Sequence, residues 1–91
     1  MFDCSKYINR IVKSLDDLHD ICNDIVGPDP MSSWYCGAVK SEGDIILVEV
    51  WKECNRFMCF EPDRLRGYMV FRVRKVDNGY VITNCYYEEE H

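Results

Sequence analysis

Apolar residues follow two different spacings along this chain of 91 residues, and the change between them limits the folds it can adopt. Between residues 7 and 26 they recur every three or four positions, as on one face of an α-helix. From Trp34 onward they form short segments separated by turn-forming residues, as in β-strands. A helix with one apolar stripe covers only one face of a sheet. The sequence therefore predicts a single α+β domain over residues 1–91, in which a helical region (1–27) packs on an antiparallel sheet (33–88) in two layers.

The helical region can be read as one helix or as two. Gly27-Pro28 ends it, and Ser14 followed by Asp17 has the form of a capping box that would start a second helix. A break there also suits the helix macrodipole, because it places Lys13 at a helix C-terminus and acidic residues at the next N-terminus. A mostly continuous helix, kinked near Ser14 at most, is the interpretation we favour.

The sheet is predicted to be a meander of four or five strands. The expected strands are 34–40, 45–52, 57–60, 67–76 and 80–87. Turn signals lie at Glu42-Gly43 and, most clearly, at Asp77-Asn78-Gly79. The apolar stripe of the helix is expected to face the second of these strands, through Leu18, Ile21 and Ile25 on the helix and Ile46, Val48 and Val50 on the strand.

Six cysteines are spread over the chain, and an even number is compatible with disulfides. The N-terminal residues MFDCSKYI do not resemble a signal peptide, and no apolar segment is long enough to span a membrane. Cys54 and Cys59 form a C-x4-C pair, but no second pair completes a zinc-binding pattern. We therefore expect reduced thiols, which pack as small apolar side chains, in a cytoplasmic protein.

Charge is sorted into blocks along the sequence. Between Lys13 and Lys40 there are five aspartates and neither lysine nor arginine, whereas residues 64–75 contain five basic residues and no acidic one. The formal net charge of −5 disfavours nonspecific binding of nucleic acid by the whole surface and permits binding to a basic partner.

The acidic block has helical spacing. Asp17, Asp20 and Asp24 fall at i, i+3 and i+7, so they share one side of a helix at a pitch comparable to that of phosphates along a nucleic-acid strand. Such a row can occupy a groove lined by lysine and arginine, although a solvated helix face has the same pattern. The predicted partner-binding residues are Asp16, Asp17, Asp20, Asp24, Glu88, Glu89 and Glu90.

The basic block supports a different function. Arg72 and Arg74 are expected on one face of a strand, opposite Met69, Phe71 and Val73, and Tyr68 is an aromatic neighbour. Arginines interleaved with aromatic residues on a sheet can bind nucleic acid, whereas a solvated strand face is the simpler reading. A small nucleic-acid-binding module is therefore one alternative function, and a structural protein-interaction domain is another.

Catalytic chemistry is not expected. His19 and Cys22 lie one helical turn apart and could form a nucleophile pair or half of a metal site, but Cys22 belongs to the apolar stripe, which favours a structural role. No phosphate-binding loop, metalloprotease motif or nucleophile elbow occurs. We expect a protein that is not an enzyme, with no catalytic residues, no cofactor and no metal.

Three segments carry a resemblance to a known group of proteins. These are KSLDDLHDICNDIVGPDP (13–30), SEGDIILVEVW (41–51) and RVRKVDNGYVITNCYYEEE (72–90), which together cover about half of the chain. In the general character of these segments, and in the size and acidity of the whole chain, the protein resembles the small early proteins of T-even bacteriophages. Among these it resembles the anti-restriction nuclease family.

The resemblance implies an inhibitor that acts in the bacterial host cell on the modification-dependent nuclease McrBC, as a dimeric mimic of DNA. The implied partner is the basic DNA-binding surface of a host protein, with no direct contact to nucleic acid and none to a membrane. The uncovered sheet face, with Tyr35, Leu47, Trp51 or Tyr86, would also suit a homodimer. A basic block turned away from the target would fit this function best.

Overall fold

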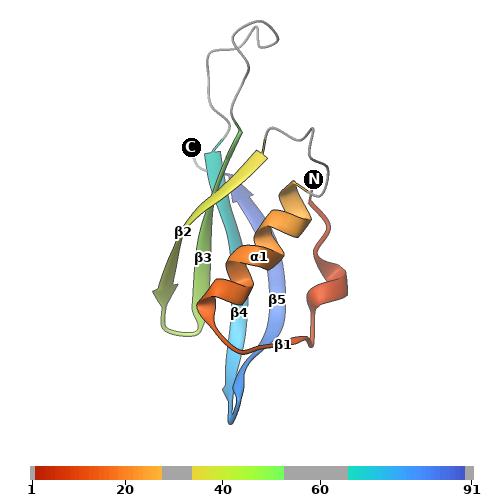
Figure 1. The fold of residues 1–91 in the computed structure, drawn as a ribbon, viewed down its shortest axis with the longest axis vertical. Helices are drawn as coiled ribbons and strands as arrows, with labels where there is room; N and C mark the ends of the chain where they lie inside the picture. The colour runs from red at the N-terminus through yellow and green to blue at the C-terminus, as the bar shows by residue number, and fades with distance from the viewer. Residues whose placement is uncertain (1, 28–33, 53–65, 90–91) are drawn as a thin grey trace, which may run out of the picture.

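One α-helix packs on a five-stranded antiparallel sheet in the computed structural model (Figure 1), which describes residues 2–27, 34–52 and 66–89. The elements are the 3-10 helix η1 (Ser5–Tyr7), β1 (Ile11–Val12), α1 (Leu15–Val26), β2 (Trp34–Glu42), β3 (Ile45–Lys52), β4 (Arg66–Val76) and β5 (Gly79–Glu89). The strand order is β1-β5-β4-β3-β2, and every neighbouring pair is antiparallel. The α+β class is thus confirmed, while the strand expected over 57–60 lies outside the described residues.

The expectation of one mostly continuous helix before Gly27 is wrong, because α1 begins only after Ser14 and the residues before it form other elements. Ile11 and Val12 form β1, which pairs with Val81 and Tyr80 of β5. Ser14 then caps α1 in a capping box, in which the Asp17 carboxylate accepts the backbone N–H of Ser14 at 3.3 Å. Pairing with the edge of β5 therefore prevails over the helical spacing of the two β-branched residues, and β1 adds a strand beyond the predicted meander.

The core lies between α1 and the sheet. Leu18 is fully buried, and Ile21 belongs to the same core cluster as Ile46, Val48 and Val50 of β3. Ile25 packs against this cluster. The predicted contact between the apolar stripe of the helix and this strand is confirmed.

Within the described strands, the pairing register shifts at two β-bulges. The register of β2 on β3 shifts between Cys36 and Val39, and that of β4 on β5 shifts between Arg72 and Val73. In the second bulge Thr83 is the extra residue, and its hydroxyl donates a hydrogen bond to the Arg72 carbonyl at 3.2 Å. Bulges increase the local twist and bend the bulged strand, so the sheet is expected to be more twisted at these two positions.

The predicted hairpin turns are confirmed with small changes in their bounds. Gly43 follows β2 with a φ of 66°, and Asp77-Asn78 connects β4 to β5, where Gly79 has a φ of 147°. Glycine reaches this region of φ without steric cost, whereas other residues rarely do. Within the described ranges, no helix is long and apolar enough to cross a membrane.

The expectation of reduced cysteines is wrong for four of the six. Disulfides join Cys4 to Cys85 and Cys22 to Cys36, with Cα atoms 6.2 Å apart in each pair. The first pair ties the N-terminal segment to β5, and the second ties α1 to β2. The partners are 81 and 14 residues apart in sequence, so only the fold brings them together. Cys54 and Cys59 lie outside the described residues.

Candidate binding surfaces

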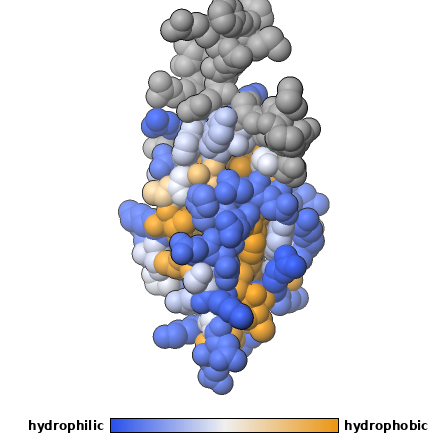
Figure 2. All heavy atoms as spheres, viewed as in Figure 1, coloured by the Kyte–Doolittle hydropathy of each residue, from blue (hydrophilic) through white to orange (hydrophobic). Residues whose placement is uncertain are grey.

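The outer side of α1 carries the acidic block. Figure 2 shows the side of the molecule that bears α1, where hydrophilic side chains cover the helix and hydrophobic ones flank it. Asp16 and Asp20 are exposed, and neither has a hydrogen bond or ion pair within the described part of the chain. Because α1 contains no lysine or arginine, its charged side chains are all acidic.

Asp17 has a structural role in the start of the helix. Its carboxylate accepts the backbone N–H of Lys13 at 2.9 Å, in addition to that of Ser14. Both donors precede the first turn of α1 and would otherwise lack a partner. The carboxylate of Asp17 is therefore oriented along the backbone and is less available to a binding partner than those of Asp16 and Asp20.

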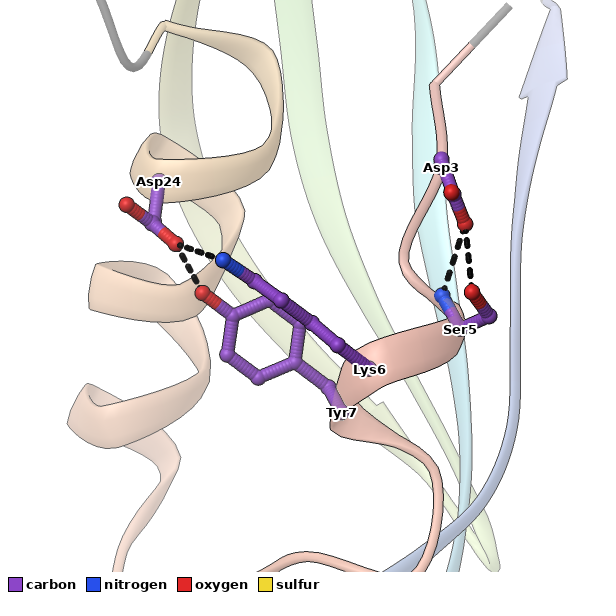
Figure 3. Close-up of polar contacts among 5 residues, drawn as sticks. All are labelled: Asp3, Ser5, Lys6, Tyr7 and Asp24. Atoms are coloured by element: carbon purple, nitrogen blue, oxygen red, sulfur yellow. Dashed lines mark hydrogen bonds and ion pairs between the residues drawn. The ribbon is translucent and has the colours of Figure 1, made fainter.

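Asp24 is held by the N-terminal segment (Figure 3). The Tyr7 hydroxyl donates a hydrogen bond to Asp24 Oδ2, and Lys6 Nζ lies 3.4 Å from the same oxygen. The hydrogen bond from Tyr7, and then the Lys6 ammonium, lower the pKa of Asp24. Burial, followed by the bond to Asp24, raises the pKa of Tyr7. Lys6 thus offsets the negative charge of Asp24 on this side of the helix.

The start of η1 is fixed by a second carboxylate in the same view. Asp3 accepts hydrogen bonds from the backbone N–H of Ser5 at 3.0 Å and from its hydroxyl at 2.7 Å, and these bonds lower the pKa of Asp3 (Figure 3). Tyr7 itself is only 4% exposed, so its ring anchors the segment in the core while its hydroxyl reaches α1. The segment before β1 is therefore held against α1.

The C-terminal glutamates do not all lie on the side of α1. Glu88 is opposite Tyr68 and Glu89 is opposite Gly67 in the β4–β5 ladder. Because Met69 and Tyr87 of the next row point to the core, Tyr68 and Glu88 point to the face of the sheet that α1 leaves open. Both glutamates are exposed, and Glu90 lies outside the described residues.

His19 and Cys22 have structural partners. Cys22 is in a disulfide, so it has no thiol to act as a nucleophile beside His19. His19 Nε2 lies 3.1 Å from the Cys36 carbonyl oxygen, and its Nδ1 lies 3.3 Å from Asn23 Nδ2. The ring therefore links α1 to β2 when Nε2 donates and Nδ1 accepts. Across residues 2–27, 34–52 and 66–89, no group of three His, Cys, Asp or Glu residues is arranged to hold a metal ion.

The open face of the sheet carries the basic block. Along β4 the core-facing Met69, Phe71 and Val73 are buried, so the alternating arginines point to the other side. Arg72 and Arg74 are exposed there, as the sequence predicts, and Arg66 and Tyr68 share that face through the same alternation. Val70 is also on this face but is only 1% exposed, between Leu47 and Tyr86 in the same row.

An aromatic pair lies at one end of the open face. Tyr35 and Trp51 are opposite each other on β2 and β3, with stacked rings whose centroids are 6.1 Å apart at an interplanar angle of 26°. The Trp51 ring also lies against the backbone of Gly37, where an added Cβ would collide with Cζ3 of the indole. The glycine therefore lets the indole lie flat across β2. Sequence reasoning missed this arrangement. It depends on a glycine on the strand beside Trp51, which is known only from the register and not from any sequence motif.

A surface pocket of about 350 Å³ lies between the N-terminal segment and β5. Its lining includes Phe2, Asp3, Tyr86 and the disulfide between Cys4 and Cys85. Phe2 packs edge-on against Trp34 and Tyr87, with ring centroids 5.0 and 5.2 Å apart. The pocket is thus bordered by packed aromatic rings, and Asp3 is the charged residue among the described residues of its lining.

Comparisons with protein-family models, with curated proteins and with solved structures gave no match for this chain.

Proposed function

We propose that this chain is a binding protein that inhibits a nucleic-acid-processing protein of a bacterial host. The carboxylates of α1 occupy the basic surface on which the host protein binds DNA, and the nuclease McrBC in the bacterial cytoplasm is the candidate target. The observation that carries the proposal is the set of exposed charges on α1, which are all negative and of which Asp16 and Asp20 have no partner in the described part of the chain.

The acidic residues should contribute unequally to binding of the partner. Asp16 and Asp20 are four residues apart on one helix, so their Cβ atoms are about 5–6 Å apart on the same side. Asp24 contributes less net charge because Lys6 is close to it, and Asp17 is engaged by the backbone before α1. Glu88 lies on the other face of the sheet and would act only through long-range attraction.

The test is inhibition of McrBC cleavage of modified DNA at two salt concentrations, with the parent and an Asp16→Asn, Asp20→Asn variant. The substitutions keep side-chain size and remove two charges. If each carboxylate contributes about 0.7 kcal/mol, as exposed ion pairs do, the variant should inhibit about tenfold more weakly at low salt. Its potency should also depend less on salt than that of the parent.

A matched control separates position from net charge. Asp44 and Asp77 are exposed in the two hairpin turns of the described strands, and changing both to Asn removes two charges from outside α1. This control should inhibit nearly as well as the parent. Equal potency of all three proteins, with equal response to salt, would refute the role of the α1 carboxylates.

A further inference from the structure

The face of the sheet that α1 leaves open combines exposed aromatic rings with arginines that have no ion pair among the described residues. We propose that this face binds single-stranded nucleic acid, with arginines on the phosphates and aromatic rings on the bases. The surface lies on the opposite side of the sheet from α1, so the inference goes beyond the proposed inhibitory function and does not depend on it. It is the opposite of the expectation that the chain makes no direct contact with nucleic acid, and the experiment below decides between the two.

The arginines of β4 form a line down the middle of the face. Arg66, Arg72 and Arg74 are exposed, and none has an ion pair with another residue in the described ranges. Residues two apart on a strand are separated by roughly 6.6–6.8 Å, so Arg72 and Arg74 can contact neighbouring phosphates of one extended strand. An arginine with no carboxylate partner retains its full set of donors for phosphate oxygens.

Aromatic rings border the part of this line between Arg66 and Val70, whereas Arg72 and Arg74 extend it beyond them. The stacked pair of Tyr35 and Trp51 lies next to Arg66, because Trp51 is opposite Arg66 in the β3–β4 ladder. Tyr35 is 44% exposed and Tyr86 is 41% exposed, so both rings can accept a base. Bases stack on aromatic side chains with little dependence on sequence.

Charge on the face favours a single strand over a duplex. Glu49 and Glu88 flank Tyr68 in one row, which leaves the face only mildly positive. Nonspecific binding of duplex DNA depends on many phosphate contacts to a strongly basic surface, whereas a single strand also gains stacking energy from its exposed bases. The open sheet supplies rings for that stacking, and its few arginines suffice to align the backbone.

The experiment measures fluorescence anisotropy of labelled oligothymidine and oligouridine, each of about 12 nucleotides, a length within the site sizes of sheet-based single-strand binders. The parent is compared with an Arg72→Gln, Arg74→Gln variant and with Tyr35→Ala. We expect about tenfold weaker binding for each. The slope of log K against log salt should decrease by about 1.4 for the double variant, because each phosphate contact contributes about 0.7 in a single strand.

The control is Lys75→Gln. Lys75 follows Arg74 and is exposed. In the β4–β5 ladder it is opposite Tyr80, which packs on the core side of the sheet, so Lys75 is not on the open face. This variant should bind like the parent, and circular dichroism should show that all variants are folded. Comparing oligothymidine with oligouridine shows whether the face binds DNA, RNA or both.

Several outcomes would overturn the proposal. One is no binding by the parent at low salt, and another is an equal loss of affinity for Lys75→Gln and for the double arginine variant. Tighter binding of a duplex of the same length would show that stacking is not used. Sedimentation that finds a dimer dissociated by Arg72→Gln, Arg74→Gln would show that a second copy of the chain covers this face.

Discussion

The four aspartates of α1 have different roles because their neighbours differ. Asp17 accepts backbone N–H groups, Asp24 is tied to Tyr7 and Lys6, and Asp16 and Asp20 are unpaired in the described part of the chain. From sequence, Asp17 stood out as the acidic member of a possible capping box, while spacing alone could not distinguish the surroundings of the other three. The partner of Asp24 comes from a segment 17 residues earlier, which helical periodicity cannot reveal.

Tyr7→Phe tests the link between η1 and α1. The variant keeps the ring in the core and removes the hydroxyl, so the pKa of Asp24 should rise toward its ordinary value of 3.8. A carboxylate with a lowered pKa stabilises the fold above its ordinary pKa, and this stabilisation is lost as the pH falls through the lowered value. The variant should therefore be less stable than the parent at pH 7, by an amount that shrinks at lower pH.

The measurement is an NMR titration of the carboxyl groups, together with urea unfolding at neutral and acidic pH. Asp3 is an internal control, because its pKa is lowered by Ser5 and should not change in the variant. An unchanged pKa of Asp24 in Tyr7→Phe would contradict the account.

At the scale of elements, the sequence predicts the sheet better than the N-terminal region. β3 has the predicted bounds, and the Asp77-Asn78 turn lies where its signal indicates, because strand alternation and turn residues are local. Ile11 and Val12 fit the apolar stripe of a helix equally well, and only the neighbouring edge of β5 decides in favour of β1. The capping box at Ser14 is the local signal that marks the true start of α1.

Leu18→Ala should lower the free energy of unfolding by about 2–5 kcal/mol, because the side chain is fully buried between α1 and β3. Ile11→Ala is the matched control, since Ile11 is 60% exposed and its truncation should change stability by only about 0.5 kcal/mol. Urea unfolding of the three proteins checks both values. Similar losses for the two variants would show that α1 does not pack as described.

At the scale of the whole molecule, the fold separates charges that alternate along the sequence. The acidic side chains of α1 lie on one side of the sheet, and the arginines of β4 lie on the other. The sequence predicts both sets and their local faces. Their placement on opposite sides of the sheet depends on which face the helix covers. The stacked pair of Tyr35 and Trp51 depends on the register between β2 and β3. The expected homodimer stays a prediction.

The disulfides join elements that are distant in sequence and should strengthen the whole fold. Under non-reducing conditions, alkylation and peptide mass spectrometry should find Cys4 linked to Cys85 and Cys22 linked to Cys36. Removing one pair by a double Cys→Ala substitution should lower stability by about 2–4 kcal/mol, because a cross-link restricts the unfolded chain. Full alkylation of all four cysteines in the purified native protein would contradict these pairs.

The proposed contact with a basic partner lies on the acidic side of α1. It is tested most directly by amide NMR of the labelled chain with a substoichiometric amount of McrBC, which shows which residues lose signal on binding. We expect the largest losses in α1 around Asp16 and Asp20, with smaller losses for Arg72 and Arg74 on the open sheet face. Losses concentrated on β4, or no change anywhere in the spectrum, would contradict the proposal.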